Sequence, residues 1–122
     1  MLALRVNGKT DASTGRDMKT QVMFAHLPLL WAPDSANVCV IGHGSGITTG
    51  STLRNPVKHV DVVEIEPAVV DASRLFNGVS GDPLADPRTH LVIEDGRTFL
   101  RDAAPGSYDV IVVDFYWVGE FT

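Results

Sequence analysis

The stretch Asn37-Val-Cys-Val-Ile-Gly-His-Gly-Ser-Gly46 decides the fold of this protein, because a continuous apolar run leads directly into three alternating glycines. An uninterrupted run of this kind is typical of a strand in a parallel sheet that is covered on both faces. A short helix follows and ends at Asn55-Pro56. A Gly-rich turn between a strand and a helix suits the close approach of backbone to a ligand, although a tight turn without a ligand has the same pattern.

Strands and helices continue to alternate along the chain. Further strands are predicted over residues 59–65, 90–94 and 108–115, and helices from Pro67 to a stop at Gly78 and over residues 97–103, with a loop over residues 79–89. This alternation indicates βαβ units with right-handed crossovers. We therefore expect an α/β fold with a Rossmann-like parallel sheet.

The N-terminal part of the chain has a different pattern. Apolar residues alternate over positions 2–6, and Asn7-Gly8 is the preferred pair for a two-residue hairpin turn, so residues 9–13 are predicted to return as a second strand. An apolar face predicts a helix over residues 17–31. The expected organisation is an N-terminal β-hairpin over 1–16 and a Rossmann-like cofactor-binding domain over 17–122.

Length and composition restrict the function. The chain has 122 residues, enough for one domain with a real core. Ten basic and fifteen acidic residues give a net charge of −5, which argues against nucleic-acid binding and suits a cationic ligand. Cys39 is the single cysteine, so no internal disulfide is expected. The sequence contains no apolar run of membrane length and no secretory signal, so we expect a cytoplasmic protein.

Acidic residues stand at the ends of three predicted strands. Glu64 lies 22 positions after Gly42, where a carboxylate can accept hydrogen bonds from both ribose hydroxyls of an adenosine. Asp95 suits an adenine amino group or, alternatively, the cap of the next helix. Asp114 suits the role of a general base; the alternative interpretation is that it is only the polar end of a strand. Glu66 is a weaker candidate and suits the cap of the helix that begins at Pro67.

The glycine spacing favours one class of adenosine cofactor. From Gly42 the pattern is G-x-G-x-G, whereas the dinucleotide fingerprint needs its third glycine where this chain has Ile47. An S-adenosyl sulfonium compound is therefore favoured over NAD, since no pyrophosphate has to be bound. The Walker pattern is absent, and His26, His43, His59 and His90 lack metal-ligand spacing, so no metal is assigned.

These motifs together resemble the spermidine/spermine synthase family of aminopropyltransferases, which have the S-adenosylmethionine methyltransferase fold. The Gly42–Gly46 turn is similar to the G-G-G-D-G motif of that family. The other matching stretches are Val6-Asn-Gly-Lys-Thr10, Gln21-Val-Met-Phe-Ala-His-Leu-Pro-Leu29, Val63-Glu-Ile-Glu-Pro67, Asp86-Pro-Arg88, Val92-Ile-Glu-Asp-Gly96 and Tyr108-Asp-Val-Ile-Val-Val-Asp114. Asp11-Ala-Ser-Thr-Gly-Arg-Asp17, together with G-H-G-S-G, resembles the divergent bacterial spermidine-synthase-like branch.

The resemblance implies a reaction and a set of site residues. Asp114 is the implied proton acceptor, and the implied reaction transfers an aminopropyl group from decarboxylated S-adenosylmethionine to an amine such as putrescine. The implied cofactor-binding residues are Gln21, Gly42, Gly44, Ser45, Gly46, Glu64, Ile65, Asp95 and Gly96. A free amine is protonated at neutral pH because its pKa is about 10, so the reaction needs a base.

Three departures from the family pattern leave alternatives open. Ser45 stands where the family has an acid that holds the aminopropyl amine, and Trp117 stands where it has a second carboxylate. The family also continues beyond the fourth strand, so the fold is expected to be truncated there. A methyltransferase that uses intact S-adenosylmethionine and a non-catalytic adenosyl-binding module remain alternatives. The apolar edge formed by residues 108–113, beside the aromatic residues after Asp114, predicts homo-oligomers.

Overall fold

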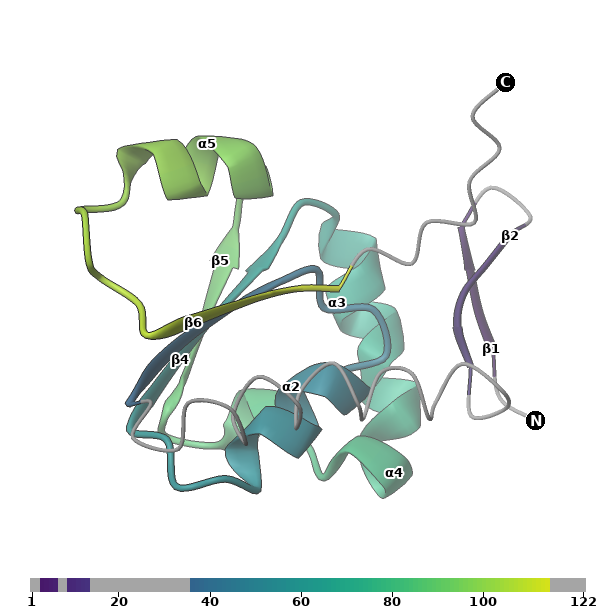
Figure 1. Ribbon diagram of the computed structural model, residues 1–122. Helices are drawn as coiled ribbons and strands as arrows, with labels where there is room; N and C mark the ends of the chain where they lie inside the picture. The colour runs from purple at the N-terminus through teal and green to yellow at the C-terminus, as the bar shows by residue number, and fades with distance from the viewer. Residues whose placement is uncertain (1–2, 7–8, 14–35, 115–122) are drawn as a thin grey trace.

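The structure, a computed structural model, describes residues 3–6, 9–13 and 36–114. Its centre is a four-stranded parallel sheet in the order β5-β4-β3-β6, which confirms the predicted α/β fold (Figure 1). The strands are β3 (Asn37–Ile41), β4 (His59–Glu64), β5 (Thr89–Ile93) and β6 (Val110–Val113). The helices are α2 (Ile47–Leu53), α3 (Pro67–Ser73), η1 (Arg74–Phe76), α4 (Asn77–Ser80), η2 (Pro83–Ala85) and α5 (Gly96–Asp102).

The two faces of the sheet carry separate cores. Helices α2, α3 and α4 lie on one face and α5 on the other (Figure 1). The first core consists of Val38, Val40, Leu53, Val57, Val60, Val62 and Val112, and the second of Cys39, Ile41 and Val63, with Phe99, Leu100 and Tyr108 packed against it. Successive side chains of a strand point to opposite faces, so the continuous apolar run of β3 supplies both cores.

Helix α2 is held firmly beneath the sheet. All seven of its residues are buried. Gly50 permits the close approach of α2 to α4, because a Cβ atom there would lie 2.0 Å from the carbonyl oxygen of Ser80. At the other end of the helix, the Arg88 guanidinium donates to the carbonyl oxygens of Leu53 at 2.7 Å and Val57 at 3.3 Å. The carboxylate of Asp86 orients this guanidinium through two further hydrogen bonds.

Some element boundaries differ from the sequence predictions. Gly78 does not end a helix: it lies inside α4, and Gly81, in the left-handed conformation with φ 81°, follows that helix instead. Tyr108 and Asp109 precede β6, which begins at Val110. Helix α5 begins one residue earlier than predicted, at Gly96, where Asp95 provides the cap.

The N-terminal hairpin is present as two antiparallel strands, β1 (Ala3–Val6) and β2 (Lys9–Ser13). The predicted helix over residues 17–31, which includes Gln21, lies outside the described residues, as do the aromatic residues after Asp114 and Trp117. No helix among the described residues is long and apolar enough to cross a membrane.

Candidate functional site

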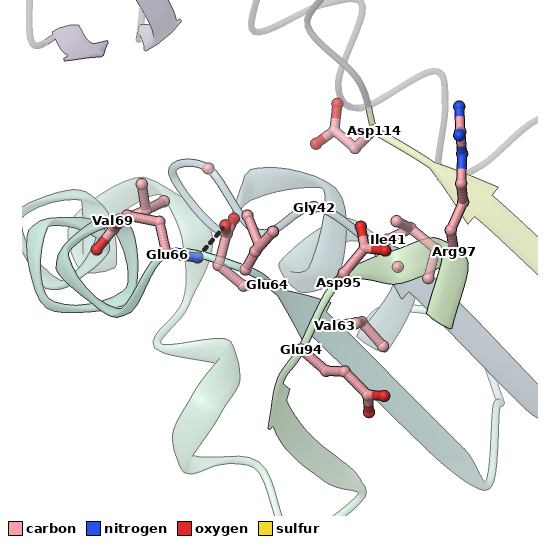
Figure 2. A pocket seen from close by; sticks show the side chains of 13 residues that line it. Ile41, Gly42, Val63, Glu64, Glu66, Val69, Glu94, Asp95, Arg97 and Asp114 are labelled. Atoms are coloured by element: carbon pink, nitrogen blue, oxygen red, sulfur yellow. Dashed lines mark hydrogen bonds between the residues drawn. The ribbon is translucent and has the colours of Figure 1, made fainter. Parts of the chain in front are cut away.

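The candidate site is a cavity of about 520 Å³ at the carboxyl ends of the four parallel strands. The glycine turn after β3 forms one wall, and the residues that follow β4, β5 and β6 form the others (Figure 2). Ligands of open α/β sheets bind at this edge, where the strands end and the helices begin. The topology therefore brings the motifs predicted from the sequence to one place.

The glycine turn fits tightly between its neighbours. Gly42 has φ 92°, and a Cβ atom there would lie 2.7 Å from the carbonyl oxygen of Asp114. The amide of Gly42 donates to the carbonyl oxygen of Val63 at 2.7 Å. Only glycine combines this left-handed conformation with so close an approach. The turn is thereby joined to the ends of both β4 and β6.

Glu64 is the most firmly held carboxylate of the cavity. It is only 8% exposed. Its Oε1 accepts from the backbone amide of His43 at 2.9 Å. Its Oε2 accepts from the backbone amide of Glu66 at 3.0 Å, the bond drawn as a dashed line in Figure 2. Each carboxylate oxygen has a second lone pair, so both retain capacity to accept from a ligand hydroxyl. The side chain is thus oriented at the cavity before any ligand binds.

Two other acids of the cavity act as helix caps. Glu66 caps α3 through a hydrogen bond from the amide of Ala68 to its Oε1 at 3.1 Å, which is the alternative role predicted for it from the sequence. Asp95 caps α5: its Oδ2 accepts from the amide of Thr98 at 3.3 Å and from the hydroxyl of the same residue at 3.1 Å. Asp95 nevertheless lines the cavity, so capping and ligand contact are compatible there.

Asp114 closes the cavity from the β6 side (Figure 2). Its backbone amide donates to the carbonyl oxygen of Ile41 at 2.8 Å, which continues the pairing of β6 with β3. Its Oδ2 accepts a hydrogen bond from the hydroxyl of Thr48 at 2.8 Å. Reasoning from the sequence did not find Thr48, because only the strand order brings the start of α2 beside the end of β6.

The remaining predicted residues divide into two groups. Gly44, Ile65 and Gly96 line the cavity, and the Ile65 side chain is 65% exposed. Ser45 and Gly46 do not line it. Ser45 is buried, and its hydroxyl oxygen is 3.4 Å from the amide of Ile47, while a Cβ atom on Gly46 would contact the His43 ring.

The His43 ring packs against Gly46 inside the glycine turn, and its protonation state follows from its surroundings. Its ring is buried, and burial lowers its pKa to about 4 even though the charge of Glu64 acts in the opposite direction. The hydroxyl of Ser73 donates to the carbonyl oxygen of Val70 at 2.6 Å, so its oxygen must accept from Nε2–H of His43 at 3.0 Å. His43 is therefore neutral, with its proton on Nε2.

The charge of the cavity suits a cation. Among the lining residues that the structure describes, the acids are Glu64, Glu66, Glu94, Asp95 and Asp114, and the one basic residue is Arg97. An excess of carboxylates with apolar walls favours a positively charged ligand. The exposed side chain of Ile65 offers an apolar surface within the same cavity.

A parallel sheet with a glycine turn and strand-end carboxylates around one cavity is the arrangement of a Rossmann-like domain. The sequence profile described as the spermine/spermidine synthase domain matches residues 18–117. The chain therefore belongs to the spermine/spermidine synthase family, as its motifs predicted.

Two similar proteins are named for different transfer reactions. Putrescine N-methyltransferase 3 of Nicotiana tabacum is 43% identical over 93 residues, which are 75% of this chain and 24% of that protein. A polyamine aminopropyltransferase of Alkaliphilus metalliredigens is 38% identical over 93 residues, 75% of this chain and 32% of the relative. The chain thus spans about a quarter to a third of these relatives.

A solved structure supports the same fold. Spermidine synthase from Thermotoga maritima superposes with a TM-score of 0.83 at 27% identity, and the match covers 92% of this chain and 38% of that one. The Rossmann-like fold of the S-adenosylmethionine methyltransferase type is thereby established for this chain.

Proposed function

We propose that this chain binds an S-adenosyl sulfonium compound in the cavity and transfers an alkyl group from it to an amine. The observation that carries the proposal is the convergence of Glu64, Asp95 and Asp114, from the ends of β4, β5 and β6, around the glycine turn that follows β3. Glu64 accepts from the ribose hydroxyls, Asp95 accepts from the adenine amino group, and Ile65 supplies an apolar surface to the adenine ring. The acidic lining attracts both the sulfonium and the amine.

The transfer we favour is that of an aminopropyl group from decarboxylated S-adenosylmethionine to a small amine such as putrescine. The amine nitrogen forms a bond to the carbon beside the sulfonium, the carbon–sulfur bond breaks, and its electron pair remains on methylthioadenosine. The proton lost by the nitrogen passes to the carboxylate of Asp114. The remainder of the rate comes from holding the two reactants in line, since the sulfonium is already a good leaving group.

A second transfer, that of a methyl group from intact S-adenosylmethionine, is supported by two observations. Ser45 stands where the aminopropyltransferase pattern has an acid, and it is buried outside the cavity lining. The relative from Nicotiana tabacum is, by name, a putrescine N-methyltransferase. In this case the amine attacks the methyl carbon, and S-adenosylhomocysteine leaves.

Product analysis separates these proposals. The 122-residue chain is incubated with putrescine and either decarboxylated or intact S-adenosylmethionine, and the nucleoside products are identified by mass spectrometry. Methylthioadenosine from the decarboxylated compound supports aminopropyl transfer, and S-adenosylhomocysteine from the intact one supports methyl transfer. The product that forms has to disappear in Asp114→Asn. Binding without either product indicates a non-catalytic adenosyl-binding module.

We further propose that two copies of the chain associate through β6. Among the described residues β6 is an edge strand, and Ile111 and Val113 are 47% and 44% exposed on its α5 side. Exposed apolar edges of this kind favour pairing with another chain. Size-exclusion chromatography coupled to light scattering is expected to give the molar mass of a dimer, and Ile111→Thr is expected to weaken this dimer. A monomer at every concentration would contradict this proposal.

A further inference from the structure

Thr48 contacts the side chain of Asp114 from α2. It is the second residue of α2 and is completely buried. Its hydroxyl lies 2.8 Å from Oδ2 of Asp114. An ionised carboxylate can only accept hydrogen bonds, so the hydroxyl of Thr48 is the donor.

The position of Thr48 is set by contacts that do not involve Asp114. The hydroxyl of Thr52, one turn along α2, donates to the carbonyl oxygen of Thr48 at 2.9 Å. Gly50 is in close backbone contact with Ser80. At the end of the helix, the Arg88 guanidinium donates to the carbonyl oxygen of Leu53 at 2.7 Å. Because α2 is fixed along its length, the hydroxyl of Thr48 is a fixed donor.

The backbone of Asp114 is fixed as well, but its carboxylate has a torsion of its own. The amide of Asp114 bonds to the carbonyl oxygen of Ile41, and Gly42 packs against its carbonyl oxygen. The terminal torsion of an aspartate is broad and roughly two-fold, so backbone pairing alone does not orient the two oxygens. A hydrogen bond from a fixed donor to one of them does.

We propose that Thr48 is a positioning residue, which holds Oδ2 of Asp114 so that the carboxylate is oriented to accept the proton of the amine. This inference rests on the proposed function and adds to it a residue whose hydroxyl never contacts the substrate. Hydrogen bonding to the ionised form also favours that form, so Thr48 keeps the base ready to accept a proton near neutral pH.

The test compares four proteins: the wild-type chain, Thr48→Val, Thr48→Ser and Thr49→Val. Valine keeps the shape of threonine and removes the hydroxyl, whereas serine keeps the hydroxyl. Thr49 is the matched control, because it is equally buried on the same helix and its hydroxyl has no hydrogen-bond partner in the structure's described part. The measured quantity is the titration of the Asp114 carboxyl carbon by ¹³C NMR, assigned with Asp114→Asn.

The carboxyl in Thr48→Val is expected to titrate at higher pH than in the wild type, while Thr48→Ser and Thr49→Val follow the wild type. In turnover, Thr48→Val is expected to lose roughly tenfold in kcat/KM, with the acidic limb of its pH profile moved upward, and Thr48→Ser to restore both. Identical titration in Thr48→Val and the wild type would overturn the proposal. If no transfer product forms but the titration still moves, the positioning contact stands and the proposed function fails.

Discussion

The two faces of the central sheet differ in how completely they are covered. On the side of α2, α3 and α4, every residue of α2 is buried and the core is aliphatic. On the opposite side, α5 has no buried residue, and Ile111 and Val113 remain exposed. The first face supports the glycine turn and Thr48, and therefore the geometry of the site. The second face is the part of the described sheet that stays open to further contacts.

The face of the sheet that carries α5, which we call the open face, also contains a polar cluster. Asp61 of β4 accepts hydrogen bonds from the hydroxyl of Tyr108, from Nε2 of His59 at 2.7 Å and from Nδ1 of His90 at 3.3 Å. Burial opposes ionisation of Asp61, but the hydrogen bonds from Tyr108 and His59 outweigh it and hold the pKa of the carboxyl below its usual value. A charged side chain is thus accommodated on this face, whereas the α2 face buries aliphatic side chains.

The greatest loss of stability is expected on the sheet face that α2 and α4 cover. Gly50→Ala places a Cβ atom 2.0 Å from the backbone oxygen of Ser80, so α2 and α4 have to separate. We expect a loss of about 3 kcal/mol or more in the free energy of unfolding, measured by urea denaturation. Gly78→Ala is the control: nothing lies within 4 Å of the added atom, and alanine favours helix, so a gain of up to about 1 kcal/mol is expected. Equal stabilities of the two variants would contradict the tight packing of α2.

The next effect concerns acid stability and His43, beneath the turn. The pKa of His43 falls from 6.5 to about 4 on folding, so below pH 6.5 the unfolded chain binds a proton that the folded chain does not. The free energy of unfolding is therefore highest above pH 6.5 and decreases by up to about 3 kcal/mol as the pH falls towards 4. Denaturation at a series of pH values measures this slope, which His43→Gln is expected to reduce. An unchanged slope in that variant would remove His43 as its cause.

The smallest effect is expected on the open face. Tyr108→Phe removes the hydroxyl that donates to Asp61 and keeps the ring that packs beside Phe99. The cost is expected to be about 1 kcal/mol, because Asp61 retains two other donors. Ionised Asp61 stabilises the fold above its unfolded pKa of 3.8, and this stabilisation is lost as the pH falls below that value. Because Tyr108→Phe removes one of the hydrogen bonds that lower the pKa of Asp61, the variant is expected to lose less stability over this pH range. A cost as large as that of Gly50→Ala would erase the difference between the faces.

The sequence predicted the fold well where local patterns determine it. The apolar run before Gly42 specifies a buried strand, and the spacing to Glu64 places a carboxylate at the end of the next one. The prediction of the helix end was wrong: Gly78 can stop a helix, but it lies inside α4, and the left-handed residue that follows the helix is Gly81. Thr48 and Asp114 are 66 residues apart in the sequence. Their contact forms because β3, which leads into α2, is the neighbour of β6 in the sheet. No pattern in the sequence specifies that neighbour relation.

We propose that Glu64 holds the ribose of an adenosyl compound in the cavity, and calorimetric binding of S-adenosylmethionine is the decisive test of this role. Glu64→Gln is compared with Glu66→Gln, since Glu66 lines the same cavity but caps α3. We expect binding by the wild-type chain, a loss of roughly tenfold or more in affinity for Glu64→Gln and little change for Glu66→Gln. Equal affinities of the two variants, or no binding by the wild-type chain, would contradict it.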